Sequence, residues 1–285
     1  MVKTYIVPFL GTCCSLGQFL KEQGYSSSML KRLRKEGGIL VNGAFRRNID
    51  EITEGEVITV DFPDKASVLP PNGSLNISIA FENEDILIFE KPDNILVHPA
   101  TRNFNDALGN YFSYLHPGIP FRPLGRLDRH TTGLCLIAKN RLTAVQLDHA
   151  IEKDYFAIAE GLVEKDQGII DAPLLRVNGS VIQRKVDPKG QPSITHYQVL
   201  YRGQHHTFLK LHLETGRTHQ IRVHMAHLGH PLAGDSLYGG SVQSIGRQAL
   251  HCGGLHFHHN GQDHHIISPL PKDMAILLSF MKHQI

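Results

Sequence analysis

The sequence predicts an α+β protein of two domains, a small one at the N-terminus and a larger one after it. The first 65 residues contain two short helix-like stretches followed by a hairpin signal, and strand-like runs dominate the remainder. Between the two parts lies a segment rich in turn-forming residues, namely Pro63, Pro70, Pro71, Asn72, Gly73 and Ser74. Such composition is typical of domain boundaries. We therefore expect domains at 1–65 and 77–285, joined by a linker at 66–76.

Composition excludes several classes of protein. The chain has 285 residues with 41% hydrophobic and 20% charged residues, which is ordinary for a globular protein. No apolar run approaches the roughly 20 residues of a membrane span, and the first residues are too mixed for a signal peptide. The four cysteines show neither metal-type spacing nor a dense disulfide framework, so we expect reduced thiols in a cytoplasmic protein. The net charge of +2 means that any nucleic-acid surface must be local.

The N-terminal part shows clear helix and turn signals. Residues 16–23 read as a short helix, and Ser26 to Ser28 supply an N-cap for a second one. Met29, Leu30 and Leu33 fall at helical spacing there, and Gly37-Gly38 ends it. A strand at 39–41 meets the Asn42-Gly43 turn, a strong hairpin signal, and a last strand follows at 57–60.

Basic residues gather in this small domain. Those on the second helix and across the hairpin are Lys31, Arg32, Arg34, Lys35, Arg46 and Arg47. Together they would form a compact cationic surface for phosphates. A solvated helix face without a ligand explains the charge alone equally well.

The central stretch of the larger domain is 124–139. Asp128 lies in a loop between Arg126 and Arg129, and Gly133 separates that loop from an apolar run at 134–138 that reads as a buried strand. Nearby cations favour the ionised form of a carboxylate, so Asp128 could act as a nucleophile without a helper base. For an isolated Arg-Leu-Asp, an ion pair at a strand edge is the simpler interpretation.

A helix and then a strand follow. Residues 141–151 read as a helix that carries Leu142, Val145 and Leu147. In the strand at 152–161, Tyr155, Ala157 and Ala159 alternate and so share one face. Taken alone, Tyr155 would be a tyrosine that packs within a sheet.

A third polar stretch covers 214–231. Thr218 can cap a helix whose apolar face is Ile221, Met225 and Leu228. On that helix His219 and Arg222 are three residues apart and hence neighbours.

The C-terminal part predicts a hairpin around Asn260-Gly261 and contains many histidines. Cys252, His256 and His258 invite a zinc interpretation, but they lack the paired spacing of most zinc sites. We favour the absence of a metal. We also assign no chemistry to His98, which we expect to hydrogen-bond its own loop.

Several of these stretches together resemble the RluA-type pseudouridine synthases. Residues 125–134 resemble their active-site signature, with Gly125 in place of the usual His and Thr132 in place of Ser. Residues 85–99 are similar to the opening of their catalytic domain, and Lys153-x-Tyr155-x-Ala157 to their second motif. Residues 216–239 are similar to the third motif, which is long and specific. The segment before Lys153 is several residues shorter than in the family. The resemblance therefore does not extend to the helix end there or to RNA contacts made by it.

A second resemblance covers about residues 13–62. The order of helix, serine-rich cap, basic helix, Val-Asn-Gly turn and Gly-Glu-x-Ile-x-Val is similar to the S4 RNA-binding domain. It implies a module that binds structured RNA by shape and phosphates.

The resemblance implies a fold and an activity. The fold would be an α+β catalytic domain around a long, largely antiparallel mixed sheet with flanking helices. The enzyme would convert specific uridines to pseudouridine, in large-subunit ribosomal RNA or in transfer RNA, without cofactor, nucleotide or metal. We further expect a monomer that binds no membrane.

The resemblance also implies roles for individual residues. Asp128 would be the nucleophile, Arg222 its charge partner, and Tyr155 the residue that stacks on the target base and could take a proton. Arg126 would fill the gap that the flipped base leaves, and Leu250 would pack under the base. Two alternatives stay open: an RNA-binding or ribosome-assembly protein without catalysis, and a metal-dependent hydrolase built on the C-terminal histidines.

Overall fold

The computed structural model describes residues 2–9, 14–61, 69–100 and 104–283. Its two largest hydrophobic clusters divide the core into an N-terminal group and a larger one. One holds N-terminal residues such as Leu20, Leu33 and Ile58 together with Leu142, and the other lies within the larger part. No helix among the described residues is long and apolar enough to cross a membrane.

The N-terminal part pairs two helices with a small sheet. Helices α1 (Leu16–Glu22) and α2 (Ser27–Lys35) pack their apolar residues against strands ordered β1-β6-β3-β4. These strands are β1 (Val2–Ile6), β6 (Val57–Asp61), β3 (Ile39–Val41) and β4 (Ala44–Phe45). A separate short pair joins β2 (Cys14–Ser15) and β5 (Glu51–Ile52). Ser26 caps α2 as predicted, because its hydroxyl accepts the N–H of Met29.

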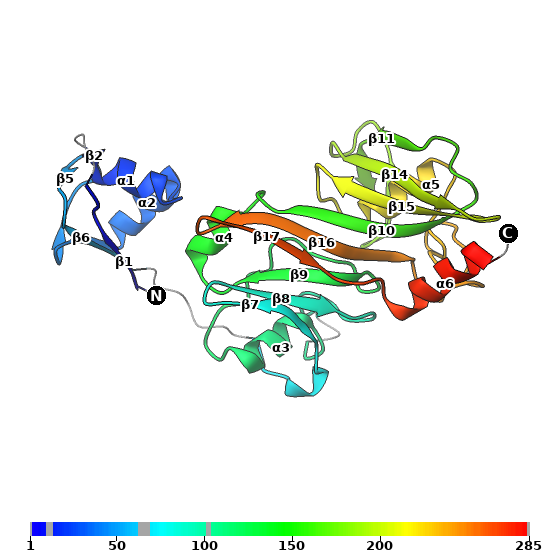
Figure 1. The fold of residues 1–285 in the computed structure, drawn as a ribbon, viewed down its shortest axis with the longest axis horizontal. Helices are drawn as coiled ribbons and strands as arrows, with labels where there is room; N and C mark the ends of the chain where they lie inside the picture. The colour runs from blue at the N-terminus through cyan, green and yellow to red at the C-terminus, as the bar shows by residue number, and fades with distance from the viewer. Residues whose placement is uncertain (1, 10–13, 62–68, 101–103, 284–285) are drawn as a thin grey trace.

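The larger part is organised around one long sheet (Figure 1), with strand order β11-β14-β15-β10-β16-β9-β8-β7 and β17 added beside β16. The strands are β7 (Ile79–Glu82), β8 (Ile86–Lys91), β9 (Thr132–Ala138), β10 (Glu152–Glu160), β11 (Gln167–Asp171), β14 (Ile194–Arg202), β15 (His206–Leu213), β16 (Leu250–His259) and β17 (Gln262–Ile267). All neighbours are antiparallel except β9 and β16. The prediction of a long, largely antiparallel mixed sheet is therefore confirmed.

Helices and a small hairpin complete this part. The helices are η1 (Gly73–Leu75), α3 (Leu108–Leu115), α4 (Arg141–Leu147), α5 (Gln220–His227) and α6 (Lys272–His283), and the hairpin pairs β12 (Leu174–Arg176) with β13 (Arg184–Val186). Helix α6 covers one face of the sheet through Met274, Leu277 and Met281, which join the buried Ile158 and Phe208 in one cluster. The first residues of β16 pair with the first residues of β9, His251 with Thr132.

The predicted linker is only partly a linker. The backbone N–H of Asn72 donates to the Asn110 carbonyl of α3 at 3.0 Å, and the Asn110 side chain donates to the Pro70 carbonyl at 2.8 Å. Residues 70–72 are thus held on the larger part. The beginning of the predicted boundary, with Pro63, lies outside the described residues, as does Cys13. Cys14, Cys135 and Cys252 are free thiols, as expected.

Two element boundaries differ from the prediction. The helix expected to reach residue 151 ends at Leu147, and Val145 is exposed rather than part of the core. The reason is that the chain must turn, with His149 at φ +62°, to pair Glu152 with His256 of β16. The strand expected from residue 134 begins two residues earlier, because the Thr132-Gly133 segment pairs with His251 and Cys252.

His251 should make stability depend on pH. It is buried at the start of β16, and its Nδ1 lies 2.9 Å from Thr132 Oγ1. Burial lowers the pKa of His251 to about 4. Since that value lies below the unfolded value of about 6.5, the neutral ring stabilises the fold fully above pH ~6.5, and this contribution, about 3 kcal/mol, is lost as pH falls toward 4.

Denaturant unfolding between pH 7.5 and pH 4 measures this effect. Wild type should lose stability on acidification, and His251→Asn should lose about 3 kcal/mol less over the same range. The exposed His149 serves as control, because His149→Asn should leave the wild-type slope unchanged. Equal slopes for wild type and His251→Asn would contradict the prediction.

Candidate active site

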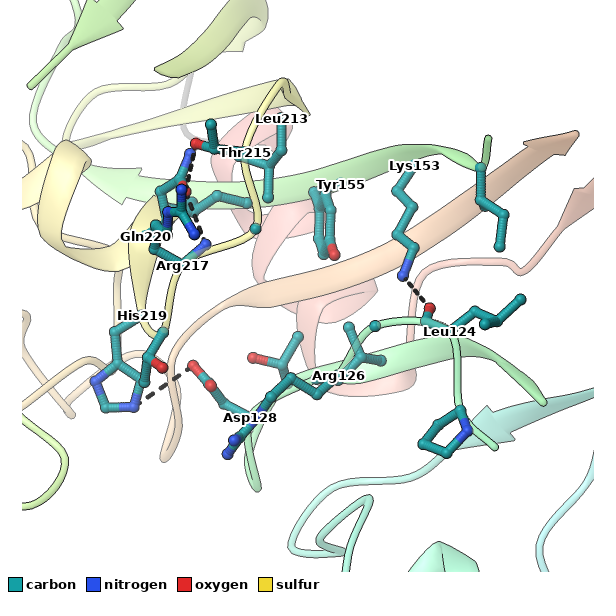
Figure 2. Close-up of a pocket in the computed structure, with 18 of the residues that line it drawn as sticks. Leu124, Arg126, Asp128, Lys153, Tyr155, Leu213, Thr215, Arg217, His219 and Gln220 are labelled. Atoms are coloured by element: carbon teal, nitrogen blue, oxygen red, sulfur yellow. Dashed lines mark hydrogen bonds and ion pairs between the residues drawn. The ribbon is translucent and has the colours of Figure 1, made fainter. Parts of the chain in front are cut away.

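The sequence-predicted residues of the larger part gather around one cavity of about 670 Å³. The loop before β9, the start of β10, the segment after β15 and the first residue of β16 all contribute to its wall. Figure 2 shows Arg126, Asp128 and Tyr155 around the same space, with His219 facing Asp128. The predicted site residues in its lining are Arg126, Asp128, Tyr155, Arg222 and Leu250. Residues almost a hundred positions apart are therefore brought together.

Asp128 is paired with Arg222, as the resemblance implied. Arg222 Nη1 lies 3.3 Å from Asp128 Oδ2, and Asp128 is partly exposed to the cavity. The other edge of the guanidinium is held by Asp235, at 2.7 Å from Nε and 2.8 Å from Nη2. Burial opposes the charge of Arg222, but Asp235 and Asp128 outweigh it and raise its pKa. A fixed cation thus faces one oxygen of Asp128.

Helix α5 carries Arg222, and the side chain of Gln220 holds this helix on β14 and on the preceding loop. The Gln220 side chain accepts the N–H of Arg217 and donates to the Ile194 carbonyl, both at 2.9 Å. The prediction that Thr218 caps this helix is wrong: the N-cap is His219, in the left-handed conformation and without a side-chain cap bond. The predicted apolar face is right for Ile221 and Met225, which are buried, and wrong for Leu228, which is exposed.

Three buried or half-buried cations hold the loop that carries Asp128. The Lys91 ammonium donates to the carbonyls of Pro92, Ile95 and Arg129 at 2.7–2.9 Å. Arg247 Nη1 donates to the His130 carbonyl at 3.0 Å, and Lys153 Nζ to the Leu124 carbonyl at 2.8 Å. The loop is therefore fixed on both sides of Asp128. Sequence reasoning gave none of the three a role, and Arg247 carries no local signal.

Gly125, where the sequence departs from the family signature, has φ +86°, which favours glycine. A Cβ at this position would lie 2.5 Å from the Lys153 ammonium. In this chain Lys153 therefore fills the space next to residue 125, beside Tyr155 (Figure 2).

Tyr155 and Leu250 form apolar walls of the cavity. Their side chains are 6% and 4% exposed, which suits a surface for stacking or packing a base. Burial raises the pKa of Tyr155 well above its ordinary value. A raised pKa favours the protonated phenol, and the role of Tyr155 as a proton acceptor stays a prediction.

Two residues at the rim differ in how they fit the predictions. Arg126 is exposed at the cavity, where its guanidinium can reach a bound molecule. His98 also lines the cavity, with its ring edge-on to Phe121 at 5.2 Å between centroids. No hydrogen bond joins the His98 ring to another described residue, and the following residues 101–103 lie outside the described part of the chain.

The predicted basic surface of the N-terminal part divides into two groups. Lys31, Arg34 and Lys35 are exposed on α2. Arg46 pairs with Glu56 at 2.8 Å, Arg47 pairs with Asp50 at 2.9 Å, and Arg32 approaches Glu36 at 3.9 Å. The α2 residues other than Arg32 are therefore the cations best placed for a ligand.

The C-terminal histidines pair with carboxylates and with one another. His256 lies 3.0 Å from Asp154 and 2.9 Å from His265, while His258 lies 2.7 Å from Asp263. In the part of the chain that the structure describes, no three His, Cys, Asp or Glu residues are arranged to hold a metal ion. These contacts with neighbouring side chains explain the position of His256 and His258 without a bound ligand.

Comparison with known proteins identifies the family. The sequence model of the family described as RNA pseudouridylate synthase matches residues 85–227, which include Asp128, Tyr155 and Arg222. The RNA pseudouridine synthase YjbO of Bacillus subtilis is 35% identical over 93% of this chain and 99% of its own. Ribosomal large subunit pseudouridine synthase D of Escherichia coli K12 is 34% identical over 90% of this chain and 87% of its own.

A solved structure shows the same fold. Human RNA pseudouridylate synthase domain containing 1 matches with a TM-score of 0.59 and 23% identity, over 75% of this chain and 97% of its own. The sequence relatives extend over nearly the whole chain, and the matched family covers the loop of Asp128, the strand of Tyr155 and the helix of Arg222. This protein belongs to the RluA family of RNA pseudouridine synthases, isomerases that act on RNA.

Proposed function

We propose that this pseudouridine synthase modifies specific uridines of large-subunit ribosomal RNA in the cytoplasm, as a monomer, with Asp128 as its nucleophile. The observation that carries the role of Asp128 is its position in the cavity, with Arg222 on one oxygen and Asp235 behind Arg222. The RNA class is supported by relatives named ribosomal large subunit pseudouridine synthase D, 33–36% identical over 90% of this chain.

The reaction fits a site built on one carboxylate. The N1–C1′ bond of uridine breaks, the uracil turns, and C5 bonds to C1′. C5 then loses its proton and N1 gains one, so the product is an isomer of the substrate. Asp128 either attacks C1′ or assists departure of the base, and Arg222 keeps the carboxylate ionised and directed. Among described residues, the hydrogen bonds and ion pairs of the Asp128 carboxylate involve Oδ2, which leaves Oδ1 to the ribose.

The walls of the cavity would hold the base outside its stack. Tyr155 would stack on the uracil and Leu250 would pack against it, since both are apolar surfaces in the lining. The exposed guanidinium of Arg126 would take the place of the flipped base in the RNA. Extrusion costs a few kcal/mol, which such contacts offset.

The N-terminal part would be an S4-like module that binds structured RNA through phosphates. Its exposed cations on α2 carry this proposal. Replacing Lys31 and Lys35 together by glutamine should weaken RNA binding and lower the slope of log K against log salt by about 2, because each lost phosphate contact removes about 1.

Filter binding across a salt series measures that slope. The matched control is Lys272→Gln/Lys282→Gln on α6, which Figure 1 places at the opposite end of the molecule from the N-terminal part. The control should keep the wild-type slope. If both double variants change the slope equally, the charge effect is general and the α2 surface has no special role.

The experiment that tests the proposed function is pseudouridine mapping of total RNA. Cells with and without the protein are compared by carbodiimide labelling and primer extension, with rescue by wild type or Asp128→Asn. Sites in large-subunit ribosomal RNA that disappear on deletion and return only with wild type support the proposal. Loss confined to transfer RNA would overturn the substrate, and rescue by Asp128→Asn would overturn the nucleophile.

A further inference from the structure

His219 lies in an unusual backbone conformation next to Asp128. Its φ is +57°, a left-handed backbone conformation that a non-glycine residue keeps only where its surroundings impose it. It is the N-cap of α5, yet its side chain makes no capping bond. The imidazole instead points into the active site, as Figure 2 shows, with its side chain 8% exposed. Helix capping therefore does not explain the left-handed backbone conformation of His219.

Each ring nitrogen of His219 has a distinct neighbour. Nδ1 lies 2.8 Å from the Tyr238 hydroxyl, and Nε2 lies 3.7 Å from Asp128 Oδ2. The Tyr238 oxygen also accepts the backbone N–H of Arg184, from strand β13, at 3.0 Å. A backbone N–H can only donate, so the hydroxyl hydrogen of Tyr238 is free to donate to Nδ1. That arrangement places the imidazole hydrogen on Nε2, toward Asp128.

The charges around His219 favour the neutral ring. Burial lowers the pKa of His219, and Arg222 and Arg184 lower it further, whereas Asp128 and Asp235 act in the opposite direction. A neutral Nε2–H can donate to a carboxylate without transferring its proton. Asp128 would then keep its charge while a second donor fixes its orientation. Distances of this kind often shorten when substrate binds.

We propose that His219 is a positioning residue for Asp128: its Nε2–H donates to Asp128 Oδ2, and Tyr238 fixes the required tautomer. Arg222 supplies charge to that same oxygen, and His219 supplies direction, so that Oδ1 faces the ribose. Tyr238 further connects this pair to the β12–β13 hairpin through Arg184. The inference rests on the proposed role of Asp128, and its test separates the two.

The test compares two amides at position 219. Glutamine places its amide nitrogen near the position of imidazole Nε2, whereas asparagine places its nitrogen near Nδ1 and does not reach Asp128. Asparagine also tolerates the left-handed conformation, so His219→Asn should fold normally. Tritium release from RNA labelled with [5-³H]uridine, taken from cells that lack the protein, reports C5–H loss at any target.

We expect His219→Asn to lower kcat by about 10- to 100-fold, which is the effect of losing one hydrogen bond to a charged group. His219→Gln keeps a donor and should lower kcat by no more than about fivefold. KM for RNA should stay within about twofold for both, since neither change removes a phosphate contact. Tyr238→Phe should lower kcat, and adding it to His219→Asn should cost nothing more.

Three outcomes would overturn the inference. One is wild-type kcat in His219→Asn, another is an equal loss of kcat in both amide variants, and the third is a double variant whose loss is the product of the two single losses. Asp128→Asn is measured in parallel. If Asp128→Asn is inactive while His219→Asn is fully active, the inference about His219 fails and the proposed role of Asp128 stands. If Asp128→Asn is active, the proposed nucleophile fails as well.

Discussion

Asp128→Asn is expected to lower pseudouridine formation by at least about a thousandfold, because loss of a nucleophile can cost up to about 10⁶-fold in kcat. The amide has nearly the same shape as the carboxylate but can neither attack C1′ nor balance charge that develops on the ribose. RNA affinity should stay close to wild type, since the cavity walls and the basic N-terminal surface are unchanged. Tritium release measures turnover, and filter binding measures affinity.

A matched control uses another paired carboxylate nearby. Asp93, in the loop after β8, lies 2.9 Å from His130 of the Asp128 loop and is not part of the cavity lining. Asp93→Asn makes the same chemical change and should keep activity within about twofold, as expected for an exposed pair. If Asp128→Asn keeps more than a tenth of wild-type activity, a different group performs the chemistry.

Local chemistry explains which features could be predicted from the sequence. Ser26 caps α2 through a bond to a residue three positions away, and Asn42-Gly43 forms its turn with positive φ at both residues. Alternation in β10 likewise places Tyr155 on the buried face. Such features depend on neighbours within a few residues, so the pattern of residue types is enough to predict them.

The missed features depend on partners far away in the chain. Arg247 reaches the carbonyl of His130 across 117 residues, and no local pattern indicates that bond. Thr218 has the right residue type for a cap, but Gln220 bonds with β14 and the loop instead, and His219 takes the left-handed conformation. Asp235 belongs to the motif at 216–239, but its pairing with Arg222 is seen only in the folded structure.

Arg222→Met should destabilise the protein by about 3–5 kcal/mol, besides abolishing turnover. The side chain of Asp235 is 1% exposed, and Arg222 is the cation that its two oxygens face. Removing the guanidinium leaves a buried carboxylate without its charge partner. Urea unfolding at pH 7 measures the loss. Arg217→Met, at an exposed arginine five residues earlier, should change stability by less than about 0.5 kcal/mol.

A double variant separates the two consequences of that ion pair. Arg222→Met/Asp235→Leu removes both buried charges, and replacement of a buried pair by apolar residues is often neutral, so much of the lost stability should return. Activity should not return, because Asp128 still lacks the cation at 3.3 Å. If the free energy of unfolding of Arg222→Met lies within about 1 kcal/mol of wild type, then water or a rearranged side chain stabilises Asp235 without Arg222. If the double variant regains turnover, Arg222 acts only by holding the fold.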